Sequence, residues 1–113
     1  MGIYWKDPTQ SPEARQAISD PEIRRVLHLI ASRSAVRLKD LFEAAGANAG
    51  NALLDAPLRA RVQSNLEILK ANGLIEEHPA PIRDFNAYNP TPAGLYVDRK
   101  LASLGLNDVA WAP

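Results

Sequence analysis

The spacing of apolar residues predicts three helices that each bury one face. Side chains three and four positions apart lie on the same side of a helix, so this repeat marks the face that packs inward. The repeat occurs in helices expected from Pro21 to about Ser32, from about Leu38 to Ala45 and from about Ala56 to Asn72. Its members are Ile23, Val26, Leu27 and Ile30; Leu38, Leu41, Phe42 and Ala45; and Leu58, Val62, Leu66 and Leu69.

Prolines and glycines mark where helices begin and end. A capping side chain followed by proline in the first turn starts a helix, because proline lacks the amide hydrogen that would have no partner there. Gly46 and Gly73 stand where a helix ends, in positions typical of a C-terminal cap. Four helix starts are therefore predicted, at Ser11–Pro12, Asp20–Pro21, Asp55–Pro57 and Thr91–Pro92. The first and the last of these add a short helix at about 12–18 and a C-terminal helix at about 92–104.

Short apolar segments between these helices predict strands. One is Ala35–Arg37, and Leu74–Glu77 with Ala87–Asn89 predicts a hairpin whose tip lies at 83–86. The prolines at 79 and 81 require the first hairpin strand to be bent or at an edge. The expected fold class is mainly α with a small β-hairpin. Its element order is that of a winged helix-turn-helix with additional N-terminal and C-terminal helices.

Composition narrows the class of protein. The 113 residues fit one domain, divided here into an N-terminal arm with a short helix (1–20), the winged helix-turn-helix domain (21–104) and a C-terminal tail (105–113). No apolar run is long enough to cross a membrane and no signal peptide precedes the domain, so a cytoplasmic protein is expected. Large aromatic residues in both tails predict that the tails dock on their own domain or on a second copy; they are Tyr4, Trp5 and Trp111.

Candidate catalytic and metal-binding residues are few. Cysteine is absent, and the two histidines, His28 and His78, are far apart in sequence. His28 falls among polar positions and is expected to be exposed, and His78 shares a strand face with Glu76 alone, which is too few ligands for a metal site. No nucleophile with a neighbouring base and no glycine-rich phosphate loop is present. The chain is therefore expected to be no enzyme, and neither a cofactor nor a metal is expected.

The charges are balanced in total but not along the chain. Lys plus Arg and Asp plus Glu both number 13, whereas nucleic-acid-binding domains usually carry an excess of basic residues. Two segments, 22–39 and 58–70, are nevertheless locally basic. They contain Arg24, Arg25, Arg33, Arg37 and Lys39 against Glu22, and Arg59, Arg61 and Lys70 against Glu67.

The segment from Arg61 to Ile75 resembles the recognition-helix region of bacterial and archaeal winged-helix regulators of the MarR, ArsR and PadR type. The shared pattern is an apolar residue, three variable positions and then Leu-x-x-Leu-x-x-x-Gly-Leu-Ile. The pattern residues are Val62, Leu66, Leu69, Gly73, Leu74 and Ile75. Further along the chain, the segment Tyr88–Gly94 is similar to the end of the wing in these proteins. The chain differs from the family at Pro90, where leucine is usual and the second wing strand is expected to end early. It also differs in the link from Gly46 to Asp55, which spans ten residues where the family has three or four.

The resemblance implies sequence-specific binding of double-stranded DNA by a transcriptional regulator. The helix at about 56–72 would lie in the major groove and the hairpin at about 74–90 would be the wing. On that helix the face opposite the apolar stripe holds Gln63 and Ser64 together with Ala60 and Glu67, and Arg59 and Arg61 flank its first turns. The expected DNA contacts are Arg59, Arg61, Gln63 and Ser64 on the helix, Arg37 and Lys39 at the start of the preceding helix, and Arg83 at the wing tip.

Two further expectations concern partners. Regulators of this type commonly dimerise through their terminal helices, so the resemblance implies a homodimer. A winged helix can also be a protein–protein interaction module without DNA binding, and the neutral net charge, the long link and Glu67 in the middle of the exposed helix face fit that alternative. Surface potential and salt dependence of binding distinguish the two functions.

Overall fold

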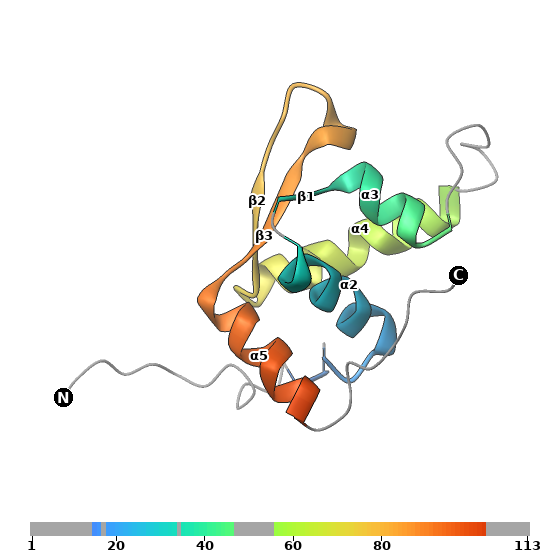
Figure 1. The fold of residues 1–113 in the computed structure, drawn as a ribbon. Helices are drawn as coiled ribbons and strands as arrows, with labels where there is room; N and C mark the ends of the chain where they lie inside the picture. The colour runs from blue at the N-terminus through green and yellow to red at the C-terminus, as the bar shows by residue number, and fades with distance from the viewer. Residues whose placement is uncertain (1–14, 17, 34, 47–55, 104–113) are drawn as a thin grey trace.

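The computed structural model describes residues 15–16, 18–33, 35–46 and 56–103, which form a mainly helical fold with a small three-stranded antiparallel sheet (Figure 1). Helix α2 is followed by the short strand β1, helices α3 and α4, a β2–β3 hairpin with a 3₁₀ turn (η3) near its tip, and helix α5. Their bounds are α2 Pro21–Ser32, β1 Val36–Arg37, α3 Leu38–Ala44, α4 Ala56–Ala71, β2 Ile75–His78, η3 Arg83–Phe85, β3 Ala87–Pro90 and α5 Pro92–Ser103.

These elements confirm the predicted order, with ends that differ by one or two residues. Of the short helix expected at 12–18, residues 15, 16 and 18 are described, and they are helical. The rest of that helix, the loop at 47–52, the cap at Asp55 and the tail aromatics lie outside the described residues. Strand β3 extends through Pro90, which pairs with Ile75, so the proline is the last residue of the strand.

The sheet contains one strand more than the expected hairpin. Strand β3 lies in the middle and pairs antiparallel with β2 on one side and with β1 on the other. The register places Val36 opposite Tyr88 and Glu77 opposite Tyr88 from the other side. Because β1 leads directly into α3, and Leu38 N–H donates to the Asn86 carbonyl (2.9 Å), the start of α3 is held beside the hairpin.

The helix ends follow the local signals in the sequence. Asp20 accepts a hydrogen bond from the Glu22 amide (2.9 Å) with Pro21 in the first turn of α2, and Thr91 Oγ1 accepts one from the Gly94 amide (3.0 Å) at the start of α5. At the end of α4, Gly73 has a φ of 69°, Gly73 N–H donates to the Lys70 carbonyl (2.9 Å) and Leu74 N–H donates to the Leu69 carbonyl (3.0 Å). This pair of bonds is the Schellman arrangement, which ends a helix and turns the chain into the following strand.

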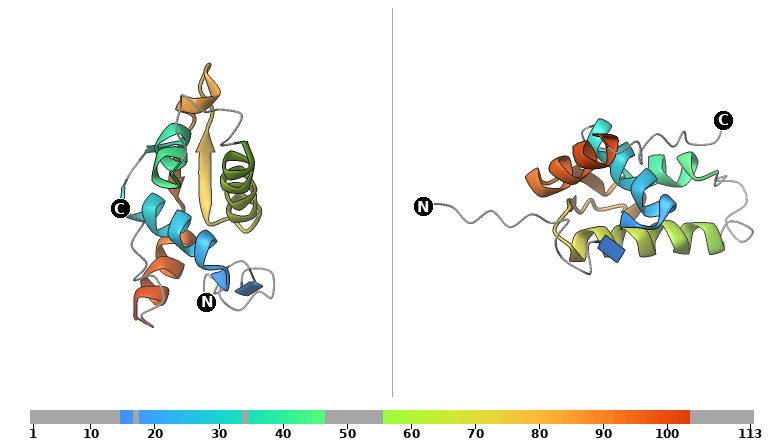
Figure 2. Two further views of the ribbon diagram at one scale, coloured as in Figure 1. Left: turned by 90° about the vertical axis from the view of Figure 1, so that its right-hand side faces the viewer. Right: turned by 90° about the horizontal axis from the view of Figure 1, so that it is seen from below.

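Helix α2 is at the centre of the core. It contacts α4, α5 and β3, and Figure 2 shows it between α4 and α5. Its apolar stripe is buried as predicted. The stripes of α3 and α4 are buried as well, except for Ala45 and Leu58, which are partly buried against the core. His28, expected to be exposed, keeps 40% of its side chain exposed but lies with Nδ1 3.0 Å from Asp98 Oδ1, so it joins α2 to α5.

The hairpin projects beyond the helices, and its tip lies at the end of the molecule opposite α5 (Figures 1 and 2). Helix α3 lies beside the hairpin and contacts η3 near its tip. The fold therefore brings the start of α3, the hairpin tip and one side of α4 to the same part of the surface. Among the described residues, no helix combines the length and the apolar character that a membrane crossing requires.

Candidate nucleic-acid interface

The outward face of α4 is polar but carries little positive charge. Ala60, Ser64 and Glu67 are exposed, and Gln63 is half-buried toward the hairpin. Val62, Leu66 and Leu69 face the core, so the helix is oriented as its sequence predicts. Asn65, which the helix geometry places at the edge of the apolar face, is buried with 7% of its surface exposed.

A hollow of about 290 Å³ lies between this face of α4 and the hairpin. Gln63 and Ser64 line it from the helix, and Arg83 lines it from η3. These three predicted contact residues are therefore brought together by the fold. Glu67 and Glu77 line the same hollow, so the site contains carboxylates as well as a guanidinium group.

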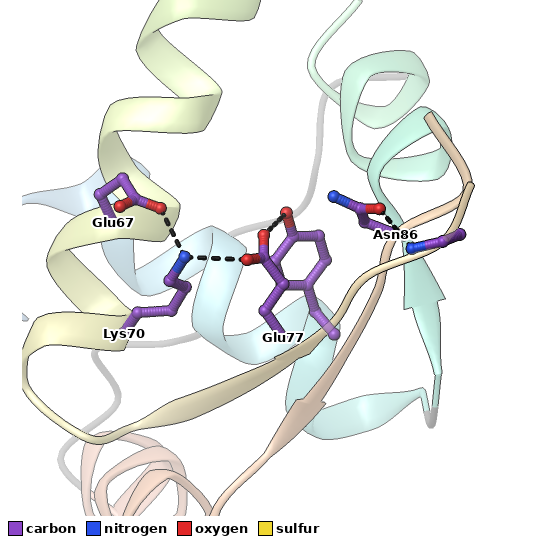
Figure 3. Close-up of polar contacts among 6 residues, drawn as sticks. Glu67, Lys70, Glu77 and Asn86 are labelled. Carbon is purple, nitrogen blue, oxygen red and sulfur yellow. Dashed lines mark hydrogen bonds and ion pairs between the residues drawn. The ribbon is translucent and has the colours of Figure 1, made fainter. Parts of the chain in front are cut away.

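Lys70 lies between those two carboxylates (Figure 3). Its Nζ is 2.8 Å from Glu67 Oε2 and 3.0 Å from Glu77 Oε1, and Glu77 also accepts a hydrogen bond from the Tyr88 hydroxyl (2.7 Å). The hydrogen bond to Glu67, followed by that to Glu77, raises the pKa of Lys70 above its usual value. The hydrogen bond from Tyr88 has the largest effect on the pKa of Glu77, which it lowers. The pKa of Tyr88 is raised, mainly by burial of the hydroxyl and next by the same hydrogen bond. This chain of contacts ties α4 to both strands of the hairpin.

The cations at the start of α3 gather around an aromatic ring of the hairpin tip. The Arg37 guanidinium and the Lys39 ammonium lie 5.6 and 5.8 Å from the centre of the Phe85 ring. Arg37, Lys39 and Arg83 are all exposed, and Phe85 keeps 41% of its surface exposed. Three of the predicted DNA contacts thus share the hairpin end of the molecule, and the ring holds two of them in place by cation–π attraction.

The remaining two arginines are directed elsewhere. The Arg59 guanidinium lies 4.9 Å from the centre of the Phe42 ring of α3, and its Nε is buried with no hydrogen-bond partner among the described residues. Arg61 is on the α2 side of the helix, where its Nη1 lies 3.7 Å from Glu22 Oε1. It keeps 60% of its side chain exposed, whereas Arg59 is half-buried. The seven predicted contact residues are therefore divided. Five lie around the hairpin, and the guanidinium groups of the other two contact residues of other helices.

Metal ligands do not cluster in the part of the chain that is described. No group of three or more His, Cys, Asp or Glu side chains occurs there that could hold an ion. His78 Nε2 and Glu76 Oε2 are 3.8 Å apart on β2, both largely exposed, and form an isolated pair.

Two features of this surface were not found from the sequence. The first is Phe85, whose role depends on the pairing of β1 with β3, because that pairing carries Arg37 and Lys39 to the ring. The second is the Lys70–Glu77–Tyr88 chain, because helix spacing predicts only the separate contact of Lys70 with Glu67. Comparisons of the chain with protein-family models, with curated proteins and with solved structures gave no significant match.

Proposed function

We propose that the chain is a winged-helix protein that binds double-stranded DNA and acts as a transcriptional regulator. Helix α4 would be the recognition helix, and the β2–β3 hairpin would be the wing. The element order and the position of β1 as a third strand against the hairpin support this assignment, since both are typical of winged helices.

The observation that carries the proposal is the gathering of Arg37, Lys39 and Arg83 at the projecting end of the hairpin, beside the hollow lined by Gln63 and Ser64. Exposed cations position a protein on phosphates, and glutamine and serine can hydrogen-bond to base edges in the major groove. Lys70 holds Glu67 and Glu77, which reduces the repulsion that these carboxylates would exert on phosphate groups.

The seven predicted contact residues are not equally well placed to reach DNA. Arg37, Lys39, Arg83, Gln63 and Ser64 form the proposed DNA surface. Arg59 would have to leave the Phe42 ring, and Arg61 would have to leave Glu22, before either could contact DNA. We therefore expect alanine at Arg59 or Arg61 to weaken DNA binding less than alanine at Arg37 or Lys39.

Fluorescence anisotropy with a labelled 25-base-pair duplex tests the proposal, with affinity measured at several salt concentrations. Each lost phosphate contact should reduce the slope of log K against log salt by about 1, so an Arg37→Ala/Lys39→Ala variant should lose about 2 in slope. Arg99→Ala is the matched control, because Arg99 is an exposed cation on α5, away from the hairpin tip. Equal slopes for the two variants, or no salt-dependent binding by the wild-type chain, would refute the proposal.

A protein–protein interaction module is the second candidate. Two exposed apolar side chains near the hairpin tip favour it, Ile82 with 62% and Phe85 with 41% of the surface exposed, together with the exposed carboxylate of Glu67 on α4. An apolar partner surface would give binding that changes little with salt and is lost in an Ile82→Ser variant. The cations around Phe85 favour the DNA reading, because they place positive charge directly at that apolar patch.

A further inference from the structure

The tip of the hairpin exposes apolar side chains that are not part of the core. Ile82 keeps 62% of its surface exposed and Phe85 keeps 41%, and they are the large apolar side chains that are exposed within the described chain. Pro81, next to Ile82, is exposed as well. Figures 1 and 2 show this tip projecting beyond the helices. Apolar residues that gather on a projecting surface, rather than lying scattered, mark a place of contact with a partner.

Hydrogen bonds within the tip hold it in one conformation. Phe85 N–H donates to the Ile82 carbonyl (3.0 Å), and Asn86 N–H donates to the Arg83 carbonyl (2.9 Å), which closes the 3₁₀ turn. The Asn86 side chain (Figure 3) accepts a hydrogen bond from the Ala80 amide (2.8 Å), so it joins the two sides of the loop. Ile82 is therefore presented on a braced support, and little conformational entropy is lost when its side chain enters a partner.

Positive charge surrounds this apolar tip. The cationic groups of Arg37 and Lys39 lie beside its aromatic ring, at 5.6 and 5.8 Å from the ring centre. Arg83 follows Ile82 directly in the chain and is exposed, whereas the carboxylate of the same turn, Asp84, is half-buried. An apolar tip among cations is complementary to a partner that carries negative charge around an apolar interior. Duplex DNA has this chemistry, with phosphates outside and stacked bases inside.

We propose that Ile82 inserts between two neighbouring base pairs from the minor groove, so that the protein kinks the DNA to which it binds. This inference rests on the proposed function, because it requires the hairpin to lie on DNA beside α4. With α4 in the major groove, a hairpin that projects beyond the helices reaches across a phosphate backbone to the neighbouring minor groove. An isoleucine that enters a base step there partly unstacks the two base pairs and bends the duplex. The cations beside Ile82 would contact the phosphates that flank this step.

An anionic lipid surface also carries negative charge around an apolar interior, but the surroundings of the tip favour DNA. Gln63 and Ser64 line the hollow beside the hairpin, and their amide and hydroxyl groups suit base edges rather than acyl chains. Insertion should occur where unstacking is least costly. TA steps are easily unstacked and A-tracts are stiff, so a duplex of alternating TA steps should bind about 3- to 10-fold more tightly than an A-tract of the same length and composition.

A duplex of alternating TA steps, with 2-aminopurine in place of its central adenines, tests the insertion directly. The fluorescence of 2-aminopurine rises when the base loses its stacking partner, so saturation with the full wild-type chain should raise it. Ile82→Ala should leave the fluorescence unchanged at saturation and weaken binding by about 3- to 10-fold, because the apolar contact is lost while the cost of unstacking is no longer incurred. Ile82→Leu keeps the apolar bulk and should keep the fluorescence rise. Since Ile82 is 62% exposed, both variants should melt at the wild-type temperature.

The outcomes separate insertion from the proposed function. Arg37→Ala/Lys39→Ala should bind with a smaller salt slope but still raise the fluorescence at saturation, whereas Ile82→Ala should keep the wild-type slope. Salt-dependent binding without a fluorescence rise, or an equal rise with Ile82→Ala, would overturn the insertion and leave the proposed function standing. No salt-dependent binding to any duplex would overturn both. Binding to phosphatidylglycerol vesicles that is lost in Ile82→Ala would overturn the insertion in favour of a lipid partner.

Discussion

Removing the Tyr88 hydroxyl tests the chain of contacts that joins α4 to the hairpin. In Tyr88→Phe the buried ring is kept, and the bond of 2.7 Å to Glu77 Oε2 is lost. A hydrogen bond to a charged acceptor contributes about 1.5–3 kcal/mol. Glu77 keeps its contact with Lys70 and 25% of its side chain is exposed to water, so the lower end applies. We expect the free energy of unfolding to fall by about 1.5 kcal/mol, and the melting temperature by about 6 °C for a chain of this size.

The pH dependence of that difference follows from the direction of each pKa shift. The lowered pKa of Glu77 gives stability that is present above the pKa of this group in the unfolded chain and is lost as the pH falls through its pKa in the folded chain. The gap in free energy of unfolding between the wild type and Tyr88→Phe should therefore narrow in acid. The raised pKa of Tyr88 gives stability that is lost as the pH rises above its ordinary value of 10.0. Tyr88→Phe lacks that loss, so the gap should narrow in alkali as well.

Urea denaturation followed by circular dichroism, at a series of pH values, measures these differences. A double-mutant cycle with Glu77→Ala, which removes the acceptor, isolates the contribution of the bond from other effects of each substitution. A difference below about 0.5 kcal/mol at neutral pH, a gap that does not change with pH, or additive effects in the cycle would each refute the reasoning.

Three other predictions concern stability and are checked by the same denaturation measurement. Gly94→Ala should lower the free energy of unfolding by about 2–4 kcal/mol, because a Cβ at this position overlaps the Leu74 carbonyl oxygen. A loss under about 1 kcal/mol would contradict the close approach of α5 to the start of the hairpin. Gly73→Ala should cost less, about 1–2 kcal/mol, since its Cβ meets nothing and only the positive φ is strained; a larger loss than in Gly94→Ala would reverse the argument. Asp98→Asn should cost less than about 1 kcal/mol, because its partner His28 is 40% exposed, and the effect should diminish at high salt.

Local signals in the sequence were sufficient for the helices. Asp20 and Thr91 cap their helices through their own side chains, and the φ of 69° at Gly73 ends α4, so each boundary depends on residues a few positions apart. The apolar stripes likewise determined which face of each helix is buried. The third strand could not be assigned a partner in this way, because β1 and β3 are separated by half of the chain.

The side chains of the candidate site were harder to predict than the backbone. Arginine side chains are long, and each can reach partners on several elements. The sequence placed Arg59 and Arg61 beside the outward face of α4, but Phe42 and Glu22, which come from other helices, determine where their guanidinium groups lie. Helix periodicity places Asn65 at the edge of the apolar face of α4, and only the tertiary structure shows that it lines a hollow.

The order of the sheet has a consequence for self-association. Strand β2 is at an edge, and such a strand can serve as a template on which another chain adds a strand. Its four residues include Glu76 and Glu77, so two molecules that met along this edge would bring carboxylates close to one another. We expect these charges to oppose fibre growth by strand addition along β2.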